Sequence, residues 1–234
     1  MAIKILKPEE RGLMENHVFK GHALFSNGMP GTPRPDAFGA VYVFNDDVLY
    51  PESFLGMHPH KNVEIVTIMI SGTESHKDML GIHENYTAGD VQLISSGKGL
   101  YHQGGNVSSV EPARHLQIWI APKTLNSKPR VMVKKTGSGQ NGLSLLVSPD
   151  AAQESLGINQ DAWIYNGKLE LNQKTNYQVQ LPGNAVLVYL VNGIVEINSI
   201  PVLEGSTVFL TDENFIELKS RNEDSKFVLI ETMV

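Results

Sequence analysis

Three histidines in the first half of the sequence have the spacing of a metal site. His58 and His60 flank a proline, and His102 follows a glycine-rich turn much further along the chain. In an extended chain, side chains two residues apart point to the same face, so the imidazoles of His58 and His60 can converge on one ion. With His102 they would leave open positions for water, substrate or oxygen. Such ligands suit one divalent transition metal, and Fe(II), Zn, Mn, Ni and Cu are all compatible with them.

Glu64 is a further candidate for this site. It lies four residues after His60, and the even offset would place both side chains on one face if the strand is continuous from residue 58. There its carboxylate would lie on the same side of the strand as the two imidazoles. The chain has no cysteine, which excludes thiolate ligands and disulfides. All eight histidines lie at or before residue 115, so histidine chemistry belongs to the first half.

The elements that position these residues are predicted to be β-strands. Segments rich in β-branched and aromatic residues recur along the chain between Gly, Asn and Asp turns. In the first half they cover 37–50 (two short strands around a turn at 45–47), 63–70, 82–95 and 115–120. In the second half they cover 143–147, 162–171, 185–191, 194–198, 207–210 and 215–219. No long helical period occurs before residue 120, which favours an all-β barrel or sandwich.

The two halves of the chain resemble each other. IVTIMISG and GDVQLI in the first half correspond to VLVYLVNG and GSTVFL in the second, each pair ending and beginning at a glycine turn. This pattern indicates a duplicated barrel. The polar stretch 122–142 is expected to contribute a linker between the two copies.

Composition restricts the class of partner. The net charge is −6 and no basic stripe is present, which argues against direct binding of DNA or RNA. The N-terminal residues contain no long apolar run, so we expect neither a signal peptide nor a membrane anchor, and a cytoplasmic location. Nothing is apolar enough to demand a partner chain, so we expect a monomer.

Four longer stretches surround the histidines: HPHKNVEIVTIMISG, ESHKDMLG, AGDVQLISSGKGLYHQ and RHLQIWIAPK. Together they resemble the pirin family, whose members are bicupins of the cupin superfamily. The matching motif residues are Gly56, His58, His60, Glu64 and Gly72 in one motif and Gly89, Gly97, Gly99 and His102 in the other. The resemblance implies an all-β fold of two cupin (jelly-roll) barrels packed face to face. The expected domains are a metal-binding cupin over 1–130 and a cupin without metal ligands over 131–234.

Position 104 departs from the family pattern. The resemblance implies one metal, usually iron, held by three histidines that match His58, His60 and His102, and by a glutamate two residues after the last of them. This chain has Gly104 there. Glu64 could take the fourth place, water or substrate could fill it, or the metal could be lost. Gln103 and Asn106 fit less well, because Gln103 has the wrong strand parity and Asn106 lies further along. We expect a three-histidine site with Glu64 nearby.

Three functions follow from the resemblance. Pirin-like bicupins include quercetin 2,3-dioxygenases, which implies an oxidoreductase acting on a small aromatic substrate, with Glu64 as the candidate base. A second hypothesis is a regulatory protein that binds transcription factors or metabolic enzymes and contacts protein, not DNA. A third is a small-molecule pocket without metal.

The remaining polar residues receive structural interpretations. We expect His76 to stabilise a turn and His83 to lie on a surface loop. His115 could line the pocket beside the metal or be hydrogen bonded in the core. Arg114 could pair with Glu111 on the surface.

Overall fold

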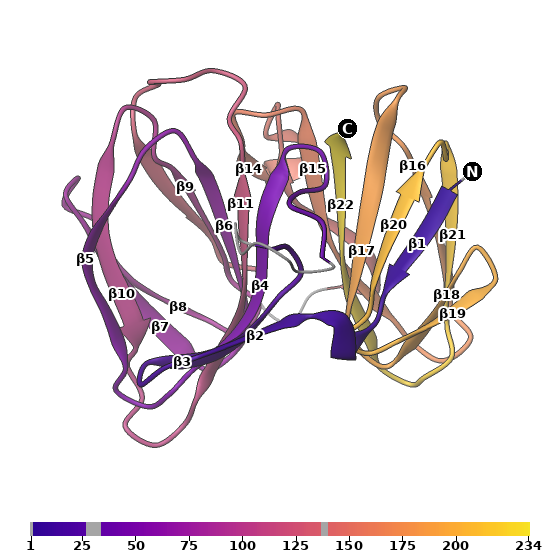
Figure 1. Ribbon diagram of the computed structural model, residues 1–234, viewed down its shortest axis with the longest axis horizontal. Coiled ribbons are helices and arrows are strands. Elements are labelled where there is room, and N and C mark those ends of the chain that lie inside the picture. The colour runs from indigo at the N-terminus through magenta and orange to yellow at the C-terminus, as the bar shows by residue number, and fades with distance from the viewer. Residues whose placement is uncertain (1, 27–33, 137–139) are drawn as a thin grey trace.

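The computed structural model describes residues 2–26, 34–136 and 140–234, which form two β-barrels side by side (Figure 1). The helical elements in these ranges are two short 3-10 turns, Pro8–Glu10 and Ala152–Glu154. The prediction of an all-β, two-barrel fold is confirmed. Within the described ranges, no helix has the length and apolar character needed to cross a membrane.

The first barrel consists of a seven-stranded and a four-stranded sheet. The large sheet has the order β12 (Arg130–Lys134), β9 (Val91–Ser95), β6 (Glu64–Ser71), β11 (Ala113–Ile120), β4 (Val41–Leu49), β3 (Phe19–Ala23) and β2 (Gly12–Glu15). The small sheet has the order β5 (Phe54–His60), β10 (Leu100–Asn106), β7 (Thr73–Asp78) and β8 (His83–Thr87).

The second barrel repeats this arrangement of seven and four strands. Its large sheet has the order β1 (Ala2–Leu6), β20 (Thr207–Thr211), β17 (Asn184–Asn192), β22 (Ser225–Met233), β15 (Ala162–Leu169), β13 (Gly142–Ser148) and β14 (Leu156–Gly157). Its small sheet has the order β16 (Lys174–Gln178), β21 (Phe215–Ser220), β18 (Ile194–Ile197) and β19 (Ile200–Leu203).

Strand exchange shifts the boundary between the barrels from the one expected at residues 130 and 131. β1 pairs with β20 of the second barrel, and Figure 1 shows this indigo strand among the orange and yellow ones. β12 pairs with β9 and completes the large sheet of the first barrel. Ile3 and Ile5 on β1 pack against the core of the second barrel. The alternation of apolar and polar residues in β1 favours a strand, but this local pattern does not determine which sheet the strand joins.

β4 is one continuous strand, although the sequence suggested a turn at residues 45–47. Asp46 and Asp47 are buried within it because each has a basic partner. Asp46 accepts two hydrogen bonds from Arg114, both 2.8 Å long. Asp47 lies 3.7 Å from His115. The expected pairing of Arg114 with Glu111 is therefore wrong: β4 and β11 are neighbours, and their register brings Arg114 to Asp46.

The two large sheets face each other and enclose an apolar core between the barrels. Phe44, Leu116 and Ile118 of the first barrel pack in one cluster with Leu187 and Tyr189 of the second, and all five are fully buried. Side chains of the two large sheets interdigitate, and each small sheet lies on the outer side of its own large sheet. This core explains why strands of the second large sheet, such as β17 and β22, are buried on both faces.

The interiors of the two barrels differ. The second barrel is filled by one apolar cluster that includes Val188, Leu218 and Phe227. The first barrel has two small apolar clusters, around Ile94 and Met69, and many of the side chains between them are polar. Room for a functional site therefore exists in the first barrel, where the histidines lie.

Candidate metal centre

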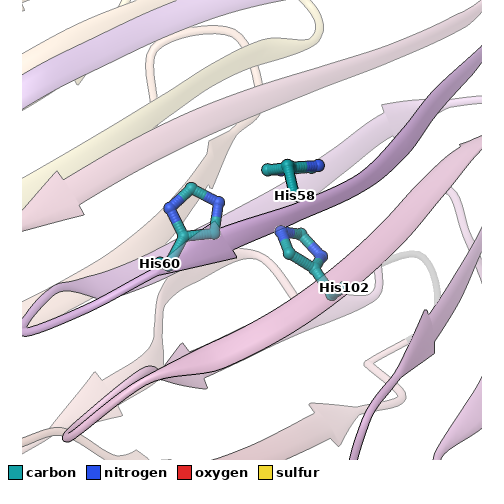
Figure 2. A group of neighbouring side chains, drawn as sticks. All are labelled: His58, His60 and His102. Carbon is teal, nitrogen blue, oxygen red and sulfur yellow. The ribbon is translucent and has the colours of Figure 1, made fainter.

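His58, His60 and His102 come together on two neighbouring strands of the first barrel, as Figure 2 shows. The register of β5 and β10 pairs His102 with His58. The distance between ring centroids is 4.9 Å for His58 and His60, 4.4 Å for His58 and His102, and 5.0 Å for His60 and His102. One ring nitrogen from each histidine lies within 4.8 Å of the other two. This spacing would let all three nitrogens bind one ion.

The local sequence of β5 explains how two ligands come from one short segment. His58 and His60 share a face because they are two residues apart in a strand. Pro59 between them has no N–H to donate, and β5 tolerates it because β5 is an edge strand of the small sheet. A register shift between His102 and Gly104 brings Leu55 opposite Gly104.

All three imidazoles are suited to bind a metal as neutral ligands. Burial and the neighbouring His58 lower the pKa of His60 to about 4. Burial, with His58 and His60 beside it, lowers the pKa of His102 to about 3. Nδ1 of His58 lies 2.7 Å from the carbonyl of Gly56, so it carries the hydrogen and leaves Nε2 free.

His102 gives the strongest indication of an absent ligand. Both of its ring nitrogens are buried, and neither has a hydrogen-bond partner among the described residues. Buried polar atoms without partners are rare, because each loses its hydrogen bonds to water without replacement. A bound divalent metal would satisfy one of these nitrogens, so the residues present fit such an ion.

Glu64 does not lie with the three histidines. β5 ends at His60 and β6 begins at Glu64, so the expected continuous strand from residue 58 is interrupted by a turn. On β6 the cavity is lined by Ile65 and Thr67, and Glu64 points to the opposite face. Its carboxylate accepts hydrogen bonds from Ser95 (2.7 Å) and from the backbone of Asn159 in the second barrel (3.3 Å).

The environment of Glu64 indicates that this residue helps to connect the two barrels. Its side chain is buried, and burial raises the pKa of its carboxyl group. The expectation that Glu64 serves as fourth ligand or base is thus not supported by its position. The cause is local. Residues 61–63 are not part of a strand, so the even spacing between His60 and Glu64 no longer places the two side chains on one face.

The residues around position 104 on β10 do not supply a fourth ligand in place of Glu64. Gly104 lines the cavity, and a Cβ at this position would lie 2.5 Å from the carbonyl oxygen of Ser75. Gln103 is not among the residues that line the cavity. Asn106 is buried, and its amide donates hydrogen bonds to backbone carbonyls at 2.7–3.3 Å, including that of Glu111. It therefore anchors a loop.

Two histidines with structural interpretations lie on β7 and β8, the next two strands of the small sheet after β10. His76 is 1% exposed, and its Nε2 lies 2.8 Å from Asp78. Its ring centroid lies 5.3 Å from that of His102, so it is a cavity residue and not a turn residue. The alternation of Glu74, His76 and Asp78 in the segment TESHKD was the signal for an inward-facing strand. His83 lies on the exposed part of β8.

His115 forms a buried ion pair on the wall of the same cavity. Its Nδ1 lies 2.6 Å from Glu74, and its Nε2 lies 3.7 Å from Asp47. Burial favours the neutral ring, but the two carboxylates raise the pKa of His115 to about 10. Tyr86 donates a hydrogen bond to the other oxygen of Glu74 at 3.4 Å. His115 is therefore a hydrogen-bonded cation on the wall of the cavity.

Comparisons with known proteins agree with this architecture. Residues 19–120 match the family described as Pirin, and residues 145–232 match the one described as Quercetinase C-terminal cupin domain. The chain is 32% identical over 229 residues to a protein named quercetin 2,3-dioxygenase from Escherichia coli (strain K12), with 98% of each chain covered. The chain belongs to the pirin family. The resemblance inferred from the histidine motifs is thus confirmed.

Solved structures show the same fold in relatives. The crystal structure of YhhW from Escherichia coli has a TM-score of 0.94 and 31% identity, covering 100% of this chain and 99% of that chain. A second structure, of the bacterial pirin YhhW in complex with nickel(II), has a TM-score of 0.92 and 31% identity, with 99% of both chains covered. An oxalate decarboxylase from Lactobacillus farciminis, at 10% identity and a TM-score of 0.69, shares the fold alone.

Proposed function

We propose that this pirin binds one divalent transition metal, Fe(II), through His58, His60 and His102. We further propose that it acts as an oxidoreductase of the quercetin 2,3-dioxygenase type on a small aromatic substrate. The observation that carries the proposal is the convergence of three imidazoles around buried nitrogens of His102 that lack partners among the described residues. The name of the Escherichia coli relative and the nickel(II) in YhhW support it.

The metal, when bound, would supply Lewis acidity and a template for substrate and oxygen. The chain's own residues set the conditions around it. The carbonyl of Gly56 orients the ring of His58, and Trp119 packs edge-on against His60 with centroids 5.0 Å apart. Ile65 and Ile94 line the cavity and limit the access of water.

The cavity restricts how an aromatic substrate would bind. Its enclosed volume is about 60 Å³, whereas pockets that enclose a drug-sized ligand measure about 300–1,000 Å³. Only the oxygen-bearing edge of a flavonol would therefore enter. The remaining rings would lie on the rim, where Leu55 is 39% exposed.

The glutamate ligand expected from the family is absent at position 104. Glu74 is the carboxylate among the described residues that line the cavity, and it is held by His115 and Tyr86. The site is thus more open and less anionic at the metal than one with a glutamate ligand. We expect the site to bind a metal and oxygen-rich ligands even without this glutamate. A group other than residue 104 would then have to accept the substrate's proton.

Metal content and flavonol turnover test this proposal. Protein purified without added metal or chelator should contain about one transition-metal ion per chain by elemental analysis, and His58→Ala should lose it. Glu64→Gln and His83→Ala are matched controls that should keep the metal. The iron-loaded protein should then consume quercetin in air faster than free iron does. A metal-free wild-type protein would refute the site, and metal-loaded protein that leaves quercetin unchanged would refute the oxygenase activity.

A further inference from the structure

Gly104 contributes no side chain to the candidate metal centre, and the neighbouring strand β7 passes directly beside it. β10 lies between β5 and β7 in the small sheet. The register pairs Gly104 with His76 and His102 with Asp78. Directly opposed residues in an antiparallel pair share a face. His76 is therefore the side chain opposite Gly104, and both residues line the same cavity.

The ring of His76 is fixed with one nitrogen unused. Nε2 lies 2.8 Å from Oδ2 of Asp78, and because a carboxylate accepts, Nε2 carries the hydrogen. Oδ1 of Asp78 accepts hydrogen bonds from the backbone N–H groups of Leu80 (2.8 Å) and Ile82 (3.1 Å). Among the described residues, Nδ1 of His76 has no hydrogen-bond partner. It is a pre-oriented acceptor on a side chain 1% exposed to solvent, beside His102.

Other polar side chains near Gly104 are already engaged. Glu74 is held by His115 at 2.6 Å and by Tyr86 at 3.4 Å. The amide of Asn106 donates to three backbone carbonyls. On the small sheet, His76 is thus the cavity residue next to Gly104 that retains a free hydrogen-bonding atom among those the structure describes.

We propose that His76 is a positioning residue: its Nδ1 accepts a hydrogen bond from a hydroxyl of the ligand that occupies the coordination position at Gly104. The inference rests on the proposed function, because it assumes a metal on the three histidines. The fitting ligands are small molecules with two adjacent oxygens, such as catechols and enediols. One oxygen binds the metal, and the neighbouring hydroxyl donates to His76, with Asp78 holding the ring.

Two substitutions of His76 separate its two nitrogens. His76→Gln keeps an N–H that can reach Asp78 but removes the acceptor that faces the cavity. His76→Asn places an amide oxygen near the position of Nδ1. Lys77→Ala is the control, because Lys77 is the next residue on β7 and is exposed. The probes are 4-nitrocatechol, which has a hydroxyl to donate, and azide, which has none, titrated optically into the Co(II)-loaded full-length protein.

We expect His76→Gln to weaken 4-nitrocatechol binding about three- to tenfold, the effect of one neutral hydrogen bond. Its azide affinity, Co(II) affinity and Co(II) spectrum should stay as in the wild-type protein. His76→Asn should bind 4-nitrocatechol more tightly than His76→Gln, and Lys77→Ala should match the wild type. These results need no catalytic turnover, so they hold even if quercetin is not oxidised.

Three results would overturn the inference. Equal weakening of both probes would show that His76 shapes the cavity without contacting a hydroxyl. A loss of Co(II) affinity in His76→Gln would make His76 a ligand or a folding residue. Unchanged 4-nitrocatechol affinity would show that His76 does not contact it. If the wild-type protein binds no Co(II), the proposed function and this inference both fail, whereas the first and third results leave the proposed three-histidine site intact.

Discussion

Asp46 joins the two barrels, and its replacement is expected to weaken the whole fold. Its side chain is 7% exposed, accepts two 2.8 Å hydrogen bonds from Arg114, and accepts another from Tyr189 of the second barrel. Burial opposes its charge, but the bonds from Arg114 lower the pKa of Asp46. Asp46→Asn would keep the shape and remove the counter-charge. Loss of one partner from a buried ion pair costs about 3–5 kcal/mol.

The lower end of that range applies because Arg114 is 29% exposed and water can partly solvate it. We expect a loss of about 3 kcal/mol, which for a chain of this size lowers Tm by roughly 6–12 °C. Thermal and urea unfolding would measure it. Asp161→Asn is the control: Asp161 forms a 2.6 Å pair with Lys123, which is 62% exposed, and such surface pairs contribute about 0–1 kcal/mol. Equal shifts in both variants would refute the reasoning.

Two further predictions concern the metal cavity. The pKa values of His60 and His102, lowered to about 4 and about 3, imply that the unfolded chain takes up protons first as pH falls. Urea unfolding of chelator-treated protein should therefore show stability declining from about pH 6.5 to pH 4, and less so in His102→Gln; identical pH profiles would contradict this. Gly104→Glu should lower stability by about 1–3 kcal/mol without tightening Ni(II) binding, because its Cβ would meet Ser75. Tighter Ni(II) binding by calorimetry would show that β10 can move.

The strands and the three histidines could be predicted because they depend on local patterns. A period of two and a short H-x-H spacing are readable in any extended segment. The pairing of His102 with His58 in the register of β5 and β10 could be expected from the family motif. His58 and His60 share a face because strand parity holds within one unbroken strand. Glu64 lies apart from them because residues 61–63 interrupt that strand.

Residues whose roles depend on distant partners could not be read from the sequence. Arg114 pairs with Asp46 because β11 and β4 are neighbours in the large sheet, which no local pattern specifies. The three polar residues at 45–47 resemble a turn until their buried partners are known. His76 and His115 likewise gained their roles from Asp78 and Glu74, which share a cavity only after the barrel closes.

The exchange of β1 into the second barrel has a consequence for folding during synthesis. β1 leaves the ribosome before the other strands described, yet its partner β20 follows about two hundred residues later, which at 5–20 residues per second is a delay of roughly 10–40 s. The first barrel can close as soon as β12 has emerged, and its histidines could capture an ion while synthesis continues. The second barrel instead needs both β1 and β22, which are far apart in the sequence. A truncated nascent product would thus carry a finished metal barrel and an open sheet edge that chaperones or proteases could detect.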